Sequence, residues 1–541
     1  MKKSETSFGL KTFRRMSPHV LVVLVFIVAL LGAWLGVDFG QHWDEPVVLN
    51  QVYHAFDTGL LLSRYYIYPS LAFYLGLAAV TPELTQYLIS RPRAPDQRMA
   101  YLVRFKFAML NYLKSDGFKF RVRKIFIVVS LLAIFWIYLL VWVWRKNAWE
   151  AFLAAALLGW SWEFSYHARW VVPDAPMLMF TVLTYLFLTL AWTRPDWTRW
   201  LKAAAITAAL TCGCKYQGGS LMLPVVLSAG WLMHQEKSQT WKRKLVFFLA
   251  SLFFLFGVVY VFTTPGTLLE PAKFLQNLGE QFGRYRTGHY GYTVHPGAEH
   301  YGLMTIYFAT AALSSCPWTA AVLFGLAGLG VYDLCRREPR WVAVSFLSFP
   351  VFYFFYMGAF SVMIVRNVLL LIPFLAILTA RGITWLWHKG GHYAVAKAVL
   401  LSVVLIALIW NAYWVLAAGR SIPQTTKAAT TKALAAYLEE HPDQVFWLSE
   451  AVIGDVAQTV QTPPRNVTRQ PAETQYAVFY TSDVTDHGVW PANHRDYFRH
   501  WFGPFEVNLN YYPTWMEPHL VILSLEKARK VLPALTPENA N

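Results

Sequence analysis

The sequence predicts an all-α domain that crosses a membrane about eleven times, followed by a small α/β or α+β domain outside the membrane. Hydrophobic residues make up 56% of the 541 residues and charged residues only 14%, whereas globular chains carry roughly 25% charged residues. Apolar runs of spanning length recur up to residue 417, and the Lys and Arg residues lie between them. This composition excludes an ordinary soluble enzyme.

The spanning segments are predicted from runs of about 20 predominantly apolar residues. The first run, 19–37, is too long for a signal-peptide core and lacks a small-residue cleavage site. We therefore expect a retained helix after a cytoplasmic segment, 1–18. The other candidates are 123–144, 148–165, 176–193, 201–213, 217–234, 244–263, 314–333, 341–358, 364–387 and 394–417. Two of them, 201–213 and 217–234, are short, and we expect them to be tilted or broken.

Basic residues predict the side of each loop, because short cytoplasmic loops are enriched in Lys and Arg. The segment 69–90 is apolar but interrupted by prolines and polar residues. If this segment does not span, the short loops on the cytoplasmic side hold about twenty basic residues. The short loops on the outer side then hold three: Arg169, Lys215 and Arg366. We therefore expect a cytoplasmic N-terminus, with 69–90 at the outer interface. The protein is expected to be integral to a membrane, which would be the plasma or inner membrane if its source is prokaryotic.

The membrane domain is predicted to cover 19–417, with long loops outside at 38–122 and 264–302. With a cytoplasmic N-terminus, an odd number of spans predicts that residues 418–541 form a soluble domain on the extracytoplasmic side, the same side as the two long loops. An amphipathic helix is expected there over Thr425–His441. Short β-rich runs follow at Val445–Ser449, Tyr476–Thr481, Glu506–Tyr511 and His519–Leu525.

The net charge of +16 does not indicate nucleic acid, because the basic residues lie between apolar runs rather than on one folded face. Anionic membrane lipids are the expected partners. The four cysteines lie in or beside apolar segments and are expected to be buried thiols. No phosphate-binding glycine motif supports nucleotide chemistry.

Three acidic residues on the outer side are candidates for catalysis. Asp44 and Glu45 follow the first span in GVDFGQHWDEP, and Asp174 lies in the turn HARWVVPDAP. Adjacent carboxylates raise one another's pKa, which suits a general base near neutral pH. The alternative is that these are ordinary acidic residues at helix starts, where the helix dipole stabilises them.

The outer cations are candidates for binding phosphate. Lys215 lies in the Gly-rich stretch TCGCKYQGGS, and Arg366 leads an apolar segment. Both residue types bind phosphate, but snorkelling toward the interface explains them equally well. Arg169 is interpreted as an interfacial residue or as a partner of Asp174.

His289 and His295, in the second long loop, are candidate ligands for a divalent metal ion together with nearby acids. Two loop histidines without a recognised ligand spacing indicate a metal only weakly. A divalent metal ion is therefore left open, and no metal ligand is assigned.

The order of these features along residues 15–417 resembles the C-type glycosyltransferase superfamily. It is most similar to the dolichyl-phosphate-mannose–protein mannosyltransferase and aminoarabinose transferase group. The features are the acid pair, the aromatic-Pro segment YYIYPSLAFYL, the Pro-Asp turn, the Lys-Tyr turn and an Arg ahead of a Leu-rich helix. The sequence departs from the group's pattern at two places, and both bear on the identity of the acceptor more than on the class of reaction. Tyr68-Pro69-Ser70 stands where the group has His-Pro-Pro, and the insertion at 91–121 is long and basic.

The resemblance implies an inverting transfer of a sugar from a polyprenyl- or dolichyl-phosphate donor to a lipid, glycan or protein acceptor outside the cytoplasm. No cofactor besides the lipid-linked donor is expected. The resemblance assigns catalysis to Asp44, Glu45 and Asp174, and donor phosphate binding to Lys215 and Arg366. The accessory candidates are Arg169, Tyr216, His289 and His295.

Two other functions are compatible with parts of the sequence. An oligosaccharide ligase or polymerase with a lipid-diphosphate donor would need more outer cations, and the second long loop offers Lys273, Arg284 and Arg286. A transporter or flippase would carry ionisable residues at mid-helix and paired broken helices in two repeated halves. The sequence contains no such repeat.

Overall fold

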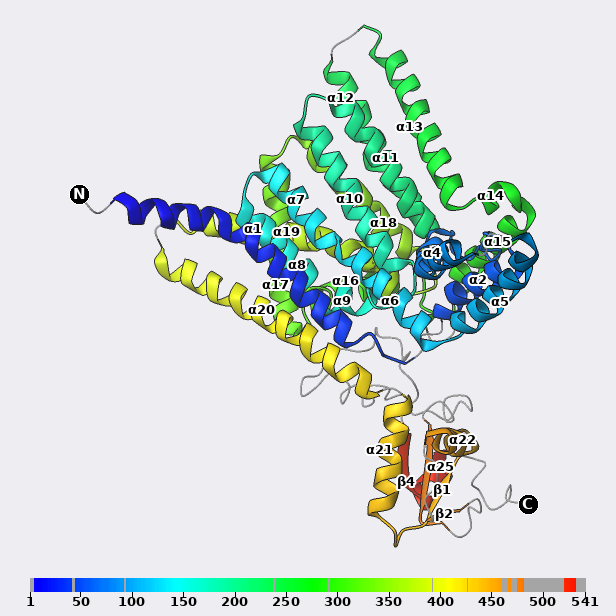
Figure 1. Ribbon diagram of the computed structural model, residues 1–541. Coiled ribbons are helices and arrows are strands. Elements are labelled where there is room, and N and C mark those ends of the chain that lie inside the picture. Colours follow the sequence, from blue (N-terminus) through cyan, green and yellow to red (C-terminus); the bar gives the residue numbers. More distant parts are fainter. Residues whose placement is uncertain are drawn as a thin grey trace. The chain divides into compact units, whose positions relative to one another are not determined.

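The computed structural model (Figure 1) divides into two compact units, Met1–Val37 with Asp44–Ala417 and Asp38–Trp43 with Ala418–Asn541. The residues that the structure describes are 4–40, 44–91, 94–236, 239–289, 292–391, 393–425, 427–459, 466–468, 474–480 and 520–531.

All eleven predicted spanning segments are helical. Within the described part of the chain, eight helices are long and apolar enough to cross a membrane. They are Ser17–Leu35 of α1 (Ser4–Leu35), Asp116–Arg145 (α6 Asp116–Leu131 and α7 Ala133–Arg145), α10 (Asp174–Thr193), α13 (Trp241–Thr263), α17 (Pro317–Arg337), α18 (Arg340–Gly358), Val365–Lys389 (η3 Val365–Leu371 and α19 Ile372–Lys389) and Ala394–Arg420 of α20 (Ala394–Ser421). The remaining predicted segments form α8 (Ala148–Gly159), α11 (Trp197–Cys214), and η1 (Tyr216–Leu221) with α12 (Met222–Gln235). The polytopic helical fold is confirmed, and the total of about eleven spans stays a prediction.

The first long loop folds into a helical cluster. It contains α2 (Glu45–Thr58), α3 (Leu71–Ala78), α4 (Thr81–Ser90) and α5 (Pro95–Leu113). The segment 69–90 is thus two helices of eight and ten residues, each much shorter than the roughly 20 residues of a span. Gly76 of α3 allows close packing on α2, because a Cβ there would lie only 3.1 Å from Val52 Cγ2. A buried apolar core joins this cluster to α6.

The second long loop forms α14 (Gly266–Leu269), α15 (Pro271–Thr287) and the start of α16 (Ala298–Thr310). Its backbone pairs with the segment that leads into η3. The amide of Met363 donates to Tyr292 O (3.0 Å), and the amide of Ser361 donates to Tyr285 O (2.9 Å). These bonds hold the loop beside the segment that carries Arg366.

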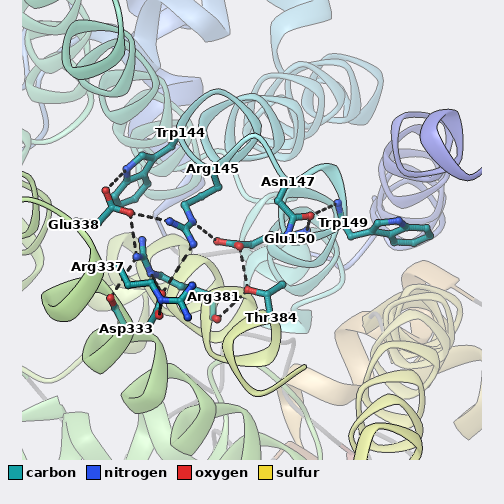
Figure 2. A network of polar contacts seen from close by, with 10 residues as sticks. All are labelled: Trp144, Arg145, Asn147, Trp149, Glu150, Asp333, Arg337, Glu338, Arg381 and Thr384. Atoms are coloured by element: carbon teal, nitrogen blue, oxygen red, sulfur yellow. Dashed lines mark hydrogen bonds and ion pairs between the residues drawn. The ribbon is translucent and has the colours of Figure 1, made fainter. Parts of the chain in front are cut away.

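An ion network of three arginines and three carboxylates joins α7, α8, α17, α19 and the α17–α18 turn, on the side predicted to be cytoplasmic (Figure 2). Arg381 Nε donates to Asp333 Oδ2 (2.8 Å), and Arg381 Nη2 donates to Glu338 Oε1 (3.0 Å). Arg145 Nη1 also donates to Glu338 Oε1 (2.8 Å), and Arg145 Nε donates to Glu150 Oε1 (3.2 Å). Arg145 and Arg381, which belong to the basic residues assigned to the cytoplasmic loops, therefore form ion pairs that connect the ends of neighbouring helices.

The second unit contains α21 (Lys427–Glu440), β1 (Phe446–Leu448), α22 (Glu450–Thr459), β2 (Val467–Thr468), β3 (Tyr476–Tyr480), β4 (Leu520–Ser524) and α25 (Leu525–Val531). The strand order is β2-β1-β3-β4, with β1 parallel to β2 and β3, and with β4 antiparallel to β3. Leu438 of α21 packs with Phe446 and Val478 in its core. The predicted small helix-and-sheet domain is confirmed, while the expected strand Glu506–Tyr511 lies outside the described residues.

Candidate active site

Asp44 immediately precedes α2, with Pro46 in the first turn of that helix. Its Oδ2 forms an ion pair with Arg366 Nη1 and accepts a hydrogen bond from Tyr68 Oη (3.4 Å). The Asp44 side chain is 19% exposed, while that of Arg366 is 6% exposed. Asp44 is thus the acid of this site that stays partly open to solvent.

Asp174 and Lys215 form a buried ion pair. Lys215 lies in extended backbone between α11 and η1, where the chain turns sharply. Its Nζ donates to Asp174 Oδ1 (2.8 Å) and to Asn367 Oδ1 (2.7 Å). Burial lowers the pKa of Lys215, but the Asp174 carboxylate outweighs it, so the pKa is raised and the ammonium stays charged.

Asn367 connects the two ion pairs. It follows Arg366 in η3, and its Oδ1 also accepts a hydrogen bond from Tyr285 Oη (3.1 Å) of α15. Asn367 O accepts another from Tyr353 Oη (2.6 Å) of α18. Among the described residues, Arg366 Nε, Asn367 Nδ2 and Asp174 Oδ2 are buried and have no hydrogen-bond partner. The structure therefore brings Asp44, Asp174, Lys215 and Arg366 into one site with unused polar atoms.

Tyr68 belongs to this candidate site, although the sequence marked it only as a departure from the family pattern. Burial, followed by the Asp44 carboxylate, raises the pKa of Tyr68 well above its usual value. The phenol therefore stays protonated and donates to Asp44. The sequence signal was the aromatic-Pro segment, whose residue types alone do not tell which tyrosine faces the acid.

The Glu45 side chain contacts other residues than the Asp44 side chain does. Its two carboxylate oxygens accept hydrogen bonds from Arg123 Nε (3.0 Å) and Nη2 (2.5 Å), and Oε1 also accepts one from Val171 N (3.1 Å). Both side chains are almost fully buried. Arg123 Nη1 also donates to Val37 O (2.8 Å). This bidentate pair fastens the start of α2 to α6 and to the segment before α10, which fits a structural role.

Arg169 is fully buried and does not pair with Asp174, whose cation is Lys215. Its Nη2 donates to Gly32 O (3.2 Å) in the last turn of α1. A Cβ on Gly36 would lie 3.1 Å from Arg169 Cζ, so the guanidinium packs directly on this helix end. A cation at a helix C-terminus is favourable, which fits stabilisation of α1.

The other accessory candidates lie around the second long loop. Tyr216 Oη donates to Tyr66 O (2.5 Å) and so holds the first long loop in place. His289 is half-buried, and burial and Arg284 lower its pKa. His295 is exposed, and its amide donates to Glu299 Oε2 (3.3 Å). Within the described ranges, no group of three or more His, Cys, Asp or Glu side chains is placed to hold a metal ion.

His167 is a buried residue that the sequence did not single out. It ends α9 (Trp162–His167), and its Nδ1 donates to Glu163 O (2.7 Å). Burial lowers its pKa to about 4, with Asp174 and Arg366 near enough to act on it electrostatically. Its Nε2 has no hydrogen-bond partner among the described residues. A neutral imidazole nitrogen is thus available beside the site.

Comparison with known proteins identifies a family and solved structures that resemble this chain. Residues 98–262 match the family described as dolichyl-phosphate-mannose-protein mannosyltransferase. The chain is similar to ArnT from Cupriavidus metallidurans in the apo state, with 13% identity over 88% of this chain and 96% of that one, and a TM-score of 0.51. A comparison with curated proteins found no match.

Two further solved structures are similar at lower TM-scores. ArnT from the same organism bound to undecaprenyl phosphate is 14% identical over 86% of this chain and 94% of that one, with a TM-score of 0.49. The archaeal oligosaccharyltransferase AglB from Archaeoglobus fulgidus, in complex with an inhibitory peptide and a dolichol-phosphate, is 12% identical over 86% and 70%, with a TM-score of 0.47. The family match and the apo ArnT likeness confirm the expected C-type glycosyltransferase fold.

Proposed function

We propose that this chain, which has the C-type glycosyltransferase fold, transfers a sugar from a polyprenyl-phosphate donor to an acceptor at the outer face of the membrane. The observation that carries the proposal is the pairing of two buried cations with two carboxylates across Asn367. Arg366 pairs with Asp44, and Lys215 pairs with Asp174. The family match over residues 98–262 and the fold support the same reaction class.

Arg366 and Lys215 would bind the donor phosphate. Negative charge develops on this phosphate as the bond to the anomeric carbon breaks, and fixed cations in a buried site stabilise that charge. Arg366 Nε, which is buried and has no hydrogen-bond partner among the described residues, is available for the phosphate. Asp174 would act as a positioning residue that holds the Lys215 ammonium in place.

Asp44 would be the general base. In the resting site its carboxylate is paired with Arg366, and a bound phosphate would compete for that guanidinium. Asp44 would then accept the proton of the acceptor hydroxyl or amine as the acceptor atom attacks the anomeric carbon. The bonding pair leaves with the phosphate oxygen, and this single displacement inverts the configuration. We assign Glu45 to structure rather than to this step, because Arg123 already occupies both of its oxygens.

An apolar pocket of about 310 Å³ suits the prenyl chain of the donor. It lies between α16, α17, α18 and α19 and is lined by phenylalanine, leucine and other largely apolar side chains, including Phe308, Phe354 and Leu371. Leu371 ends η3, five residues after Arg366. A chain in this pocket would start next to the proposed phosphate site.

A polar groove suits the acceptor. Its volume is about 590 Å³, and it runs along α2 from Pro46 to Thr58. Asn50, His54 and Lys273 line it and offer hydrogen bonds to a hydroxyl- or amine-bearing molecule. The groove begins two residues after Asp44, which would give the acceptor a path to the base.

The proposal is tested with purified protein and a polyprenyl-phosphate sugar donor. General-base and electrostatic contributions are each worth roughly 10²–10³-fold in kcat, so Asp44→Asn and Lys215→Ala should each lose at least that factor. Asp57→Asn, an exposed acid of the same helix α2, is the matched control and should keep full activity. Full activity of both site variants with unchanged folding would overturn the assignment.

A parallel reaction with a polyprenyl-diphosphate donor separates the two enzyme classes. Turnover of the diphosphate donor alone would favour the oligosaccharide ligase or polymerase, with Lys273 of the groove as a candidate contact for the second phosphate. Turnover of the monophosphate donor alone would support the function proposed here.

A further inference from the structure

A second groove lies between α17, α19 and α20. Its volume is about 620 Å³, within the range of about 300–1,000 Å³ for small-molecule pockets. Val322 of α17, Leu386 of α19 and Leu400 of α20 are among the apolar side chains of its wall. Neither the fold nor the proposed reaction gives this groove a role.

The groove also contains two lysines. Lys389 is the last residue of α19, and Lys397 lies in the first turn of α20. The Lys397 Nζ sits 5.5 Å from the ring centre of Trp387, and its Cγ lies 3.6 Å from where a Cβ of Gly390 would be. Within the described part of the chain, neither lysine is in a salt bridge with a carboxylate. The lining of this apolar groove therefore includes two lysines that have no carboxylate partner among the described residues.

The groove is separate from the proposed donor phosphate site. Arg366 and Lys389 lie near opposite ends of the same apolar segment, Val365–Lys389. The 18 residues of α19 alone extend about 27 Å at 1.5 Å per residue. If Arg366 lies at the outer face, Lys389 lies at the inner face, in agreement with its basic loop.

We propose that this groove binds an anionic diacyl phospholipid of the inner leaflet. One acyl chain lies along the apolar wall, and the headgroup phosphate lies between Lys389 and Lys397. Trp387, 40% exposed beside them, lies at the headgroup level that tryptophan prefers. Basic pockets between helices on the cytoplasmic side are suited to such headgroups. This proposal does not depend on the transferase reaction.

The test measures lipid binding by the full-length protein in neutral detergent, using phosphatidylglycerol and phosphatidylcholine as probes in native mass spectrometry. Each lysine near an anionic lipid strengthens binding by roughly fivefold. The double variant Lys389→Gln with Lys397→Gln should therefore bind phosphatidylglycerol about 30-fold more weakly. The matched control is Lys242→Gln with Arg243→Gln, two exposed cations in the first turn of α13, which should change binding less than about twofold. Leu400→Trp keeps both lysines but fills the groove, and it should weaken binding as well.

Three results would overturn the proposal. Equal losses in the two double variants would mean that any surface cations attract the lipid. Equal binding of phosphatidylcholine would mean that the lysines do not select the headgroup. Displacement of phosphatidylglycerol by an equal concentration of polyprenyl phosphate would assign the groove to the prenyl lipid instead. Thermal unfolding of each lipid-free variant verifies that the protein is folded.

Discussion

Replacing Glu45 by Gln separates the two adjacent acids of the first long loop. The Glu45 carboxylate is buried and accepts three hydrogen bonds, two from Arg123 and one from the Val171 amide. Gln keeps the shape but removes the charge, so the buried Arg123 guanidinium loses the carboxylate that it contacts at both oxygens. Removing one partner of a buried ion pair costs about 3–5 kcal/mol. Glu45→Gln should therefore lower the unfolding temperature clearly while leaving kcat per folded molecule close to that of the wild type.

Asp44→Asn should lose kcat per folded molecule, because Asp44 is proposed to act in the reaction. It should also lose some stability, because Asp44 is the counter-ion of the buried Arg366, so the activity of folded protein is what separates the two variants. Thermal unfolding in detergent and transfer activity normalised to folded protein are measured on both variants. Glu45→Leu combined with Arg123→Met is the control, since replacing a whole buried pair by apolar residues is often neutral, and it should recover part of the lost stability. A Glu45→Gln protein that unfolds like the wild type but has lost as much activity as Asp44→Asn would refute this reasoning.

Three further predictions concern other parts of the membrane domain. Arg381→Met removes a buried cation that Asp333 and Glu338 share, while Arg337 still pairs with Asp333 and Arg145 with Glu338. The cost should therefore be about 1.5–3 kcal/mol, the range for hydrogen bonds to charged groups, measured as a lower unfolding temperature with unchanged donor KM. Gly330→Val should separate α17 from α19, because a Cβ there would lie 1.9 Å from Leu378 O, and the expected outcome is loss of folded protein in size-exclusion chromatography; normal yield would contradict it. His167 has a pKa of about 4 in the folded protein against an ordinary value of 6.5, so the unfolded chain takes up its proton at a higher pH than the folded one. The contribution of His167 to stability should therefore fall by about 3 kcal/mol as the pH drops from 6.5 to 4. A pH series of unfolding temperatures tests this, and His167→Gln should flatten the series.

The four principal residues of the candidate site could be selected from the sequence because each is an exception to a local pattern, while their roles stay a prediction. Lys215 and Arg366 are cations where the charge bias expects few, and Asp44 and Asp174 stand next to apolar helices. Such exceptions can be read from neighbouring residues alone. The family resemblance supplied their proposed roles, and the structure supplied their proximity.

The pairing among these residues could not be predicted. Glu45 bonds with Arg123, which is 78 residues away, and Lys215 bonds with Asn367, which is 152 residues away. Adjacent acids look equivalent in sequence, yet a helix start directs successive side chains to different neighbours. His167 and Asn367 were not identified from the sequence for the same reason, and Tyr68 was named only as a departure from the family pattern. Each becomes a residue of the candidate site only through contacts made by distant segments.

The sequence by itself determined that this protein is a polytopic helical membrane protein with a small helix-and-sheet domain after it. Hydrophobicity and charge act over a single helix length, so about 20 consecutive residues are enough to predict a span and its orientation. Only the tertiary structure decided that Asp44 faces Arg366 while Glu45 faces Arg123, and that Arg169 packs on the end of α1. Those outcomes depend on how buried charges from distant segments neutralise one another, because an unpaired charge in the interior is too costly to persist.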